Sequence, residues 1–308
     1  MDFDLIVNIL FATIRTGTPL ILIALGEMVA EKSGVLNLGQ EGMVLIGAAS
    51  GFIAAVATGN AGFGVVAAII AGMLVSLLFA ILAVSLVTNQ YATGLALTIF
   101  GIGLSAFIGA DYVGMAIDGI TAWHIPLLSD IPVIGKILFS HDPLVYLSWI
   151  IFAVLFWIFR STRLGLTIRA VGENPEAANA IGIPVMKVRY GAVLFGGAMA
   201  GLAGAYLSLV YTPMWSEGMS AGRGWIALAL VVFASWKAER ILLGAYLFGA
   251  ASIMHLVLQG LGFEASPNLL AMLPYVATII VLVVIASDSI KAKLNTPLAL
   301  GQPYRPQV

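Results

Sequence analysis

Hydrophobic residues dominate long stretches of this chain, and charged residues are confined to the segments between them. The longest such stretch, Gly42–Ala110, contains no Asp, Glu, Lys or Arg. A soluble helix needs charged or polar residues on its exposed face, whereas a membrane-spanning helix needs about 20 mainly apolar residues. The stretch therefore predicts about three consecutive transmembrane helices.

The same pattern continues along the chain and predicts an all-α, polytopic membrane protein, with a single transmembrane domain over residues 1–308. Hydrophobic residues make up 61% of the sequence and charged residues only 9%. The crossing near 224–237 is short, so we expect it to begin in the wall of a cavity rather than in lipid. We expect nine crossings, near residues 5–26, 42–58, 64–88, 92–110, 143–160, 190–210, 224–237, 241–261 and 268–287.

Lysine and arginine are distributed unequally between the two sides that these crossings define. Of the 14 such residues, only Lys136 and Arg223 fall on one side, and Arg15 lies within the first crossing. Because cytoplasmic segments are enriched in Lys and Arg, we expect loop 161–189 and the C-terminus to be cytoplasmic and the N-terminus to lie outside. The remaining eleven are Lys32, Arg160, Arg163, Arg169, Lys187, Arg189, Lys237, Arg240, Lys291, Lys293 and Arg305.

Arg15 would lie near the bilayer centre, where a charged side chain costs about 2.5–3.5 kcal/mol on insertion scales. Two interpretations are open. Arg15 faces a polar interior, or residues 2–15 form an elbow helix on the outer surface and the crossing starts at Thr16. Glycine and proline within Thr16–Pro19 are typical of a helix break, so we favour the elbow.

The segment Gly26–Gly42 joins the first two crossings and is too polar for a lipid-facing helix. It is either a cytoplasmic loop or a broken helix that enters the protein interior. In the second case its free backbone groups, with Asn37, Gln40 and Glu41, line a polar path. The pattern alone favours neither interpretation.

The segment Thr162–Ile183 predicts a short, capped helix in the main cytoplasmic loop. Asn174 is a good N-cap, Pro175 suits the first turn and Glu176 complements the positive helix end. Gly182 then ends the helix after about two turns. Such a helix is either a simple interfacial connection or a rod that docks into a groove on a cytoplasmic partner.

Two glycine pairs predict close helix packing inside the bundle. Gly47 with Gly51, and Gly197 with Gly201, are both spaced as GxxxG, which lets helix backbones approach. Asn89–Gly94 predicts a tight polar turn between two crossings, either a plain loop or a gate.

Several kinds of chemistry are excluded or disfavoured by the residues present. The chain has no cysteine, so disulfides and thiolate sites are absent, and its three histidines are too far apart for metal-ligand spacing. No nucleotide-binding motif is present. We therefore expect no cofactor in this chain, with any ATP bound by another subunit.

Three separated motifs give the chain a family resemblance. Glu176-Ala177-Ala178 followed by Gly182 reproduces the EAA-xxx-G pattern of ABC-importer permeases of the branched-chain amino acid, ribose and nucleoside group. Ser33–Gly42 and Arg223–Leu230 resemble two signatures of the nucleoside and simple-sugar branch. The chain lacks the extra N-terminal crossing of ribose-type permeases, so it is most similar to the shorter permease subunit of nucleoside importers. Phe233–Arg240 departs from the glycine-rich turn usual there.

The resemblance implies a subunit of the bacterial cytoplasmic (inner) membrane that performs no bond chemistry. A second, longer permease subunit would complete a heterodimeric pore, ABC ATPase subunits would bind ATP beneath it, and an extracytoplasmic substrate-binding protein would deliver substrate. No nucleic acid would be bound. Helix 175–182 would lie in a cleft of the ATPase. The residues expected to couple to the ATPase are Arg169, Gly172, Glu173, Asn174, Pro175, Glu176, Ala177, Ala178 and Gly182.

The resemblance also implies a nucleoside substrate, with a simple sugar of the ribose type as the alternative. An ion-driven secondary transporter is less favoured, because apart from Arg15 we find no clear mid-membrane charge and no internal repeat. For a nucleoside we expect a path lined with amide and hydroxyl groups. The candidates are Asn37, Gln40, Glu41, Asn89, Gln90 and Thr93.

Overall fold

A computed structural model describes residues 3–260, 266, 272, 276, 279 and 295–305. Within these residues the chain is helical and forms no β-strand. Seven helices are long and apolar enough to cross a membrane, which confirms the all-α, polytopic class. The predicted crossing 268–287 lies outside the described residues, apart from three isolated positions. The seven spans are Asp4–Lys32, Gln40–Thr58, Ala61–Ser85, Gln90–Tyr112, Pro143–Ser161, Val185–Tyr211 and Ala238–Gly260.

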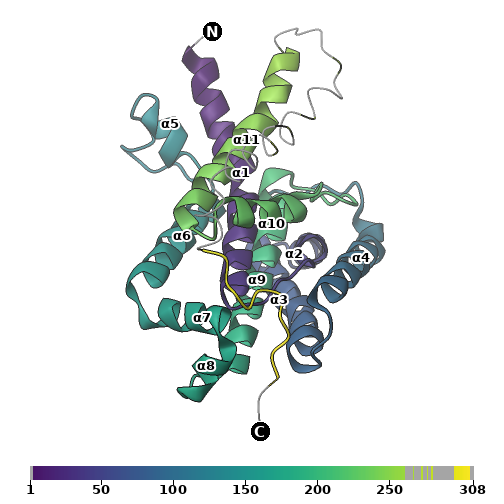
Figure 1. Cartoon of the computed structure of the whole chain (residues 1–308). Helices are drawn as coiled ribbons and strands as arrows, with labels where there is room; N and C mark the ends of the chain where they lie inside the picture. Colours follow the sequence, from purple (N-terminus) through teal and green to yellow (C-terminus); the bar gives the residue numbers. More distant parts are fainter. Residues whose placement is uncertain are drawn as a thin grey trace.

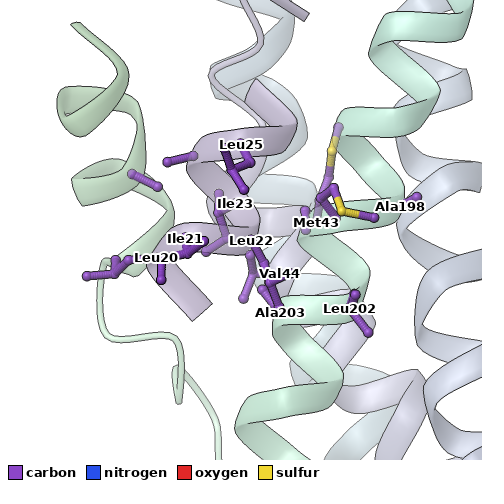
Figure 2. Close-up of a cluster of buried hydrophobic side chains, with 14 of the residues drawn as sticks. Leu20, Ile21, Leu22, Ile23, Leu25, Met43, Val44, Ala198, Leu202 and Ala203 are labelled. Atoms are coloured by element: carbon purple, nitrogen blue, oxygen red, sulfur yellow. The ribbon is translucent and has the colours of Figure 1, made fainter. Parts of the chain in front are cut away.

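Four helices form the centre of the molecule: α1 (Phe3–Lys32), α2 (Gln40–Thr58), α3 (Ala61–Ala80) and α9 (Val185–Tyr206). Helix α9 packs against the other three and is the most buried span. Figure 2 shows part of the buried apolar cluster, to which α1 contributes Leu20–Ile23 and Leu25, α2 contributes Met43 and Val44, and α9 contributes Ala198, Leu202 and Ala203. The core is thus built around α9 and not around a sheet.

The remaining spans surround this centre. Helix α4 (Gln90–Gly109) packs on α2, α11 (Ala238–Gly260) on α1, and α6 (Pro143–Ser161) lies at the periphery (Figure 1). The expected short crossing is α10, which has 11 residues, Arg223–Phe233. Helices α3 and α9 each end in a π-helical turn, Ile81–Ser85 and Leu207–Tyr211.

Helix α1 is one continuous helix over Phe3–Lys32, so the expected elbow helix 2–15 with a crossing that starts at Thr16 is wrong. Pro19 lies inside α1 and removes one backbone donor. The helix nevertheless continues, because α9, α10 and α11 all pack against α1, and neighbouring helices make proline tolerable inside a membrane span. Tertiary packing has overridden the local break signal.

Arg15 therefore faces the protein, as the first of the two interpretations proposed. Its Nη2 donates to the carbonyl of Val210 at 3.2 Å, and its guanidinium lies 6.0 Å from the ring centroid of Tyr211. Both partners belong to the π-helical turn at the end of α9, where the last carbonyls lack helical donors and the helix dipole is negative. This helix terminus stabilises the charge of the half-buried Arg15.

The predicted close packing at glycines is confirmed, and Gly47 and Gly201, one glycine from each GxxxG pair, lie against each other inside the chain. A methyl group on Gly47 of α2 would lie 2.6 Å from the Cα of Gly201 of α9. A methyl group on Gly51 would lie 3.1 Å from the carbonyl oxygen of Gly64 on α3. Helices α2, α3 and α9 are thus in backbone contact, which only glycine permits here.

Candidate coupling surface and buried polar segment

The predicted cytoplasmic loop folds into two short helices, α7 (Arg163–Glu173) and α8 (Pro175–Ala180). As expected, Asn174 caps α8, and its Oδ1 accepts a hydrogen bond from the backbone N–H of Ala177 at 2.9 Å. The expected helix 175–182 begins at the right residue but ends two residues early. Gly182 follows with φ of +85°, a left-handed conformation that ends the helix as predicted.

Helix α8 is attached by one apolar side and leaves its other sides exposed. Ala178 packs with Val171 of α7, Val185 of α9 and Tyr304 near the C-terminus. Gly172 is also buried and Pro175 is half-buried. The structure thus brings the nine predicted residues into one region. Those exposed at its surface are Arg169, Glu173, Asn174, Glu176, Ala177 and Gly182.

Residues 295–305 lie against α7 and the end of α1, an arrangement that the sequence analysis did not predict (Figure 1). The N–H of Ala299 donates to the carbonyl of Gly172 at 2.9 Å, and that of Gly301 donates to Gly34 at 3.2 Å. This segment and the start of α8 enclose a cavity of about 350 Å³. Its lining comprises Glu173, Asn174, Pro175, Glu176, Leu298, Ala299, Gln302, Pro303, Tyr304 and Arg305.

Arg189 holds the same C-terminal segment from the other side. Arg189 was predicted to lie in the cytoplasmic loop, but it lies in the second turn of α9 and is only 1% exposed. Its Nη1 donates to the carbonyl of Gln302 at 3.3 Å, and its guanidinium lies 5.7 Å from the ring centroid of Tyr304. A carbonyl and an aromatic face therefore surround this buried cation.

The polar segment after α1 lies in the protein interior. Helix α1 continues to Lys32, and the non-helical residues 33–39 that follow are mostly buried. Both carboxylate oxygens of Glu27 hold this segment: one accepts from the N–H of Asn37 at 2.9 Å, the other from Nε2 of Gln40 at 2.5 Å. A carboxylate of α1 thereby fixes the start of α2.

Glu41 connects the same segment to α10. One carboxylate oxygen accepts from Oγ of Ser220 at 2.5 Å and from the N–H of Gly222 at 2.9 Å. The other accepts from the N–H of Gly224 at 2.7 Å. Because the first N–H groups of a helix have no carbonyl partner within the helix, Glu41 acts as a cap supplied by another helix.

The other predicted path residues lie in two different environments. Gln90 is buried beside the polar segment, and its Oε1 accepts from the N–H of Leu36 at 2.8 Å. Asn89 is exposed and caps α4 by accepting from the N–H of Ala92 at 3.0 Å. Thr93 pairs with the hydroxyl of exposed Thr88 at 2.8 Å. That these residues and the buried ones line a substrate path stays a prediction.

Comparison with known proteins places these elements in a family. Residues 9–284 match the model of the permease component of branched-chain amino acid transport systems. The chain belongs to this permease family. A Haloferax volcanii protein assigned as a glucose ABC transporter permease, TsgC13, is 40% identical over 96% of this chain and 97% of its own length. No solved structure matches the permease significantly.

Two further relatives of the permease also align over almost their full length. The nucleoside ABC transporter permease protein NupC of Lactococcus lactis is 34% identical over 90% of this chain and 92% of its own length. The guanosine ABC transporter permease protein NupQ of Bacillus subtilis is 35% identical over 99% of this chain and 98% of its own length. A second guanosine permease protein of Bacillus subtilis, NupP, is 27% identical, and the alignment covers 72% of its length.

The permease also buries acidic residues that the sequence analysis missed. Glu27 and Glu31 are 0% and 1% exposed, and Oε2 of Glu31 accepts from Nε1 of Trp236 at 2.5 Å. Their four-residue spacing, which places both on one face of a helix, was the available signal. The sequence predicted a loop or a broken helix from Gly26 onward, and neither expectation extends the regular helix α1 to these residues.

The loop before α6 is anchored to the first half of α1. The ring of His141 stacks on Phe11 with centroids 4.6 Å apart, and its Nε2 lies 2.8 Å from the carbonyl of Ile137. Burial lowers the pKa of His141 below its ordinary value of 6.5, because the charged form would lose its hydration. Lys136 donates to Asn8 at 2.6 Å. These contacts lie at the end of the permease opposite α7 and α8 (Figure 1).

Proposed function

We propose that this permease subunit carries nucleosides. The observation that supports the proposal most is the match to two relatives, named for nucleosides and for guanosine, over at least 90% of this chain. The motifs at Ser33–Gly42 and Arg223–Leu230 favour the same branch. A simple sugar is the second candidate, because the 40% identical relative is assigned to glucose.

Uptake measurements distinguish the two substrate classes. In cells that contain or lack this chain, we expect uptake of labelled guanosine and other ribonucleosides to depend on the chain, whereas uptake of labelled glucose and ribose does not. Loss of sugar uptake alone would move the protein to the sugar branch. If none of these substrates depended on the chain, the substrate proposal would fail and the family assignment alone would stand.

The permease works, in this proposal, with a second permease subunit, an ABC ATPase that binds ATP, and an extracytoplasmic substrate-binding protein in the bacterial inner membrane. Two guanosine permease proteins of one organism, NupQ and NupP, support a heterodimer. The alignment with this chain covers 98% of NupQ but only 72% of NupP. NupP therefore has more sequence outside the aligned part, which supports a longer second permease subunit. Loop 161–189 and the C-terminus are cytoplasmic, and the N-terminus lies outside.

The coupling surface of the proposed complex comprises α8 and the cavity beside it. Helix α8 is short and capped, and its exposed residues lie at the end of the molecule that carries most of the positive charge. Residues 298–305 form the second wall of that cavity. An ATPase subunit that binds here can displace α8, and α8 transmits the displacement through Ala178 to α7 and α9.

Two substitutions test this coupling. We expect Glu176→Lys, which reverses an exposed charge on α8, and Gly182→Pro, which cannot adopt φ of +85°, to lower substrate-stimulated ATP hydrolysis at least tenfold while the chain stays inserted. The measurement is ATPase activity of the reconstituted complex together with retention of the ATPase during purification. Glu217→Lys reverses an exposed charge far from α8 and should leave both unchanged. Normal assembly and hydrolysis in both α8 variants would disprove the coupling assignment.

A further inference from the structure

A second cavity, of about 290 Å³, lies among the ends of α1, α6 and α7 and the start of α11. Four of the residues that line it are cationic: Lys32, Arg160, Arg169 and Lys237. One lining residue, Glu239, is acidic. The other lining residues are Met28, Phe156, Phe159, Trp236, Ala238 and Asn295.

The four cations have no carboxylate partner within 4.0 Å among the residues that the structure describes. Two of the four cations, Lys32 and Arg160, lie over aromatic rings. Nζ of Lys32 lies 5.3 Å from the ring centroid of Phe159, and Cζ of Arg160 lies 5.6 Å from that of Phe156. Arg169 donates from Nε to the carbonyl of Gly165, on its own helix. Glu173 and Glu239 attract Lys32 and offset part of this positive charge, and an anion between the cations would stabilise the remainder.

The position of the cavity indicates where this anion comes from. Arg160 ends α6, the span with the smallest buried share, 22% against 89% for α9. Val154 and Trp157, within the last two turns of α6, are 46% and 60% exposed and face outward. The cavity thus adjoins a lipid-facing helix at the level where its apolar part ends, which is the level of lipid headgroups.

We propose that this cavity binds the phosphate of an anionic phospholipid headgroup. Lys32 and Lys237 provide ammonium groups within the cavity, and the guanidinium groups of Arg160 and Arg169 provide paired N–H donors that suit phosphate oxygens. The acyl chains lie along the exposed face of α6. Basic pockets between transmembrane helices on the cytoplasmic side are typical headgroup sites. The proposal does not depend on the transported substrate.

Native mass spectrometry of the full chain, purified in detergent, tests the proposal. Phosphatidylglycerol is compared with phosphatidylcholine, which carries the same phosphate but no net charge. We expect phosphatidylglycerol to bind at least fivefold more tightly. The triple variant Lys32→Gln, Arg169→Gln, Lys237→Gln should remove this preference. The matched control, Arg163→Gln with Arg240→Gln, alters two basic residues outside the cavity and should keep it.

Competition with inorganic phosphate distinguishes a lipid from a free anion. If millimolar phosphate leaves lipid binding intact, the ligand is the lipid. If phosphate displaces it completely, the cavity is a general phosphate site and the lipid assignment is overturned. Equal binding of the two lipids, or an unchanged preference in the triple variant, would overturn the whole proposal. Should the triple variant fail to elute as a single species, Lys237→Gln alone, with Lys237→Arg as rescue, decides the same question.

Discussion

Replacing Gly201 by alanine is expected to prevent the permease from reaching a stable fold, whereas replacing Gly191, on the same helix, is not. A methyl group on Gly201 would overlap the carbonyl oxygen of Ala68 and lie 3.1 Å from the Cα of Ile69. These are backbone atoms of α3, so no side-chain rotation can relieve the overlap. Helix α3 would have to move away from α9 along the most extensive helix contact in the bundle.

The expected loss of folding free energy in Gly201→Ala depends on how many helix interfaces the added methyl group disturbs. Overpacking a core usually costs about 1–3 kcal/mol, and more where backbones must shift. Gly47 of α2 also packs against the Cα of Gly201. A shift of α9 would therefore disturb its interface with α2 as well as its interface with α3. We therefore expect a loss of about 3 kcal/mol or more, enough to deplete the folded protein.

The measurement is the yield of monodisperse protein in detergent and its apparent melting temperature. Gly191→Ala is the matched control, because a methyl group there has no neighbour within 4 Å. Alanine in place of glycine inside a helix is neutral or stabilising by up to about 1 kcal/mol. If Gly201→Ala melted like Gly191→Ala, the backbone contact between α3 and α9 would not exist as described.

The close packing at these glycines could be predicted from the sequence, but the partner of each glycine could not. GxxxG spacing indicates that a helix allows close approach, and it carries no information on which helix approaches. The structure pairs Gly47 with Gly201, which are far apart in the chain, and packs α3 against both helices, at Gly51 and at Gly201. Only the arrangement of the whole bundle decides such pairings.

The spans and the capped helix α8 were also predictable, because hydropathy and capping act locally. The break at Thr16 was predicted wrongly for the complementary reason: a local signal was overridden by packing from α9, α10 and α11. The C-terminal segment was missed because its binding to Gly34 and Gly172 uses backbone groups. Every residue carries such groups, so no sequence pattern marks them.

Buried acidic residues show the same limit in the candidate site. Glu41 was predicted to line a substrate path because its segment is polar and rich in glycine. In the structure its carboxylate accepts from three donors, on Ser220, Gly222 and Gly224, and its place in a substrate path stays a prediction. A polar residue in a membrane protein can serve transport or hold the fold, and composition does not separate the two roles.

Glu41→Ala is expected to destabilise the permease by about 3 kcal/mol or more, the second large effect. Glu41 is 6% exposed, so removal of its carboxylate leaves the buried hydroxyl of Ser220, the buried N–H of Gly224 and the half-buried N–H of Gly222 without an acceptor. Each unsatisfied buried group costs about 1–3 kcal/mol. The negative charge also complements the positive end of α10, and this contribution is lost as well.

Glu41→Gln separates the two roles of this residue. The amide keeps one acceptor oxygen but directs an NH₂ group at a donor, so stability should fall between wild type and Glu41→Ala. Glu217→Ala removes an exposed carboxylate from the loop before α10 and should melt like wild type. If Glu41→Ala melted normally yet abolished uptake, Glu41 would belong to the substrate path and not to the cap. If melting temperature and uptake fell together in proportion across the variants, capping would be its role, because a residue in the path alters transport without unfolding the bundle.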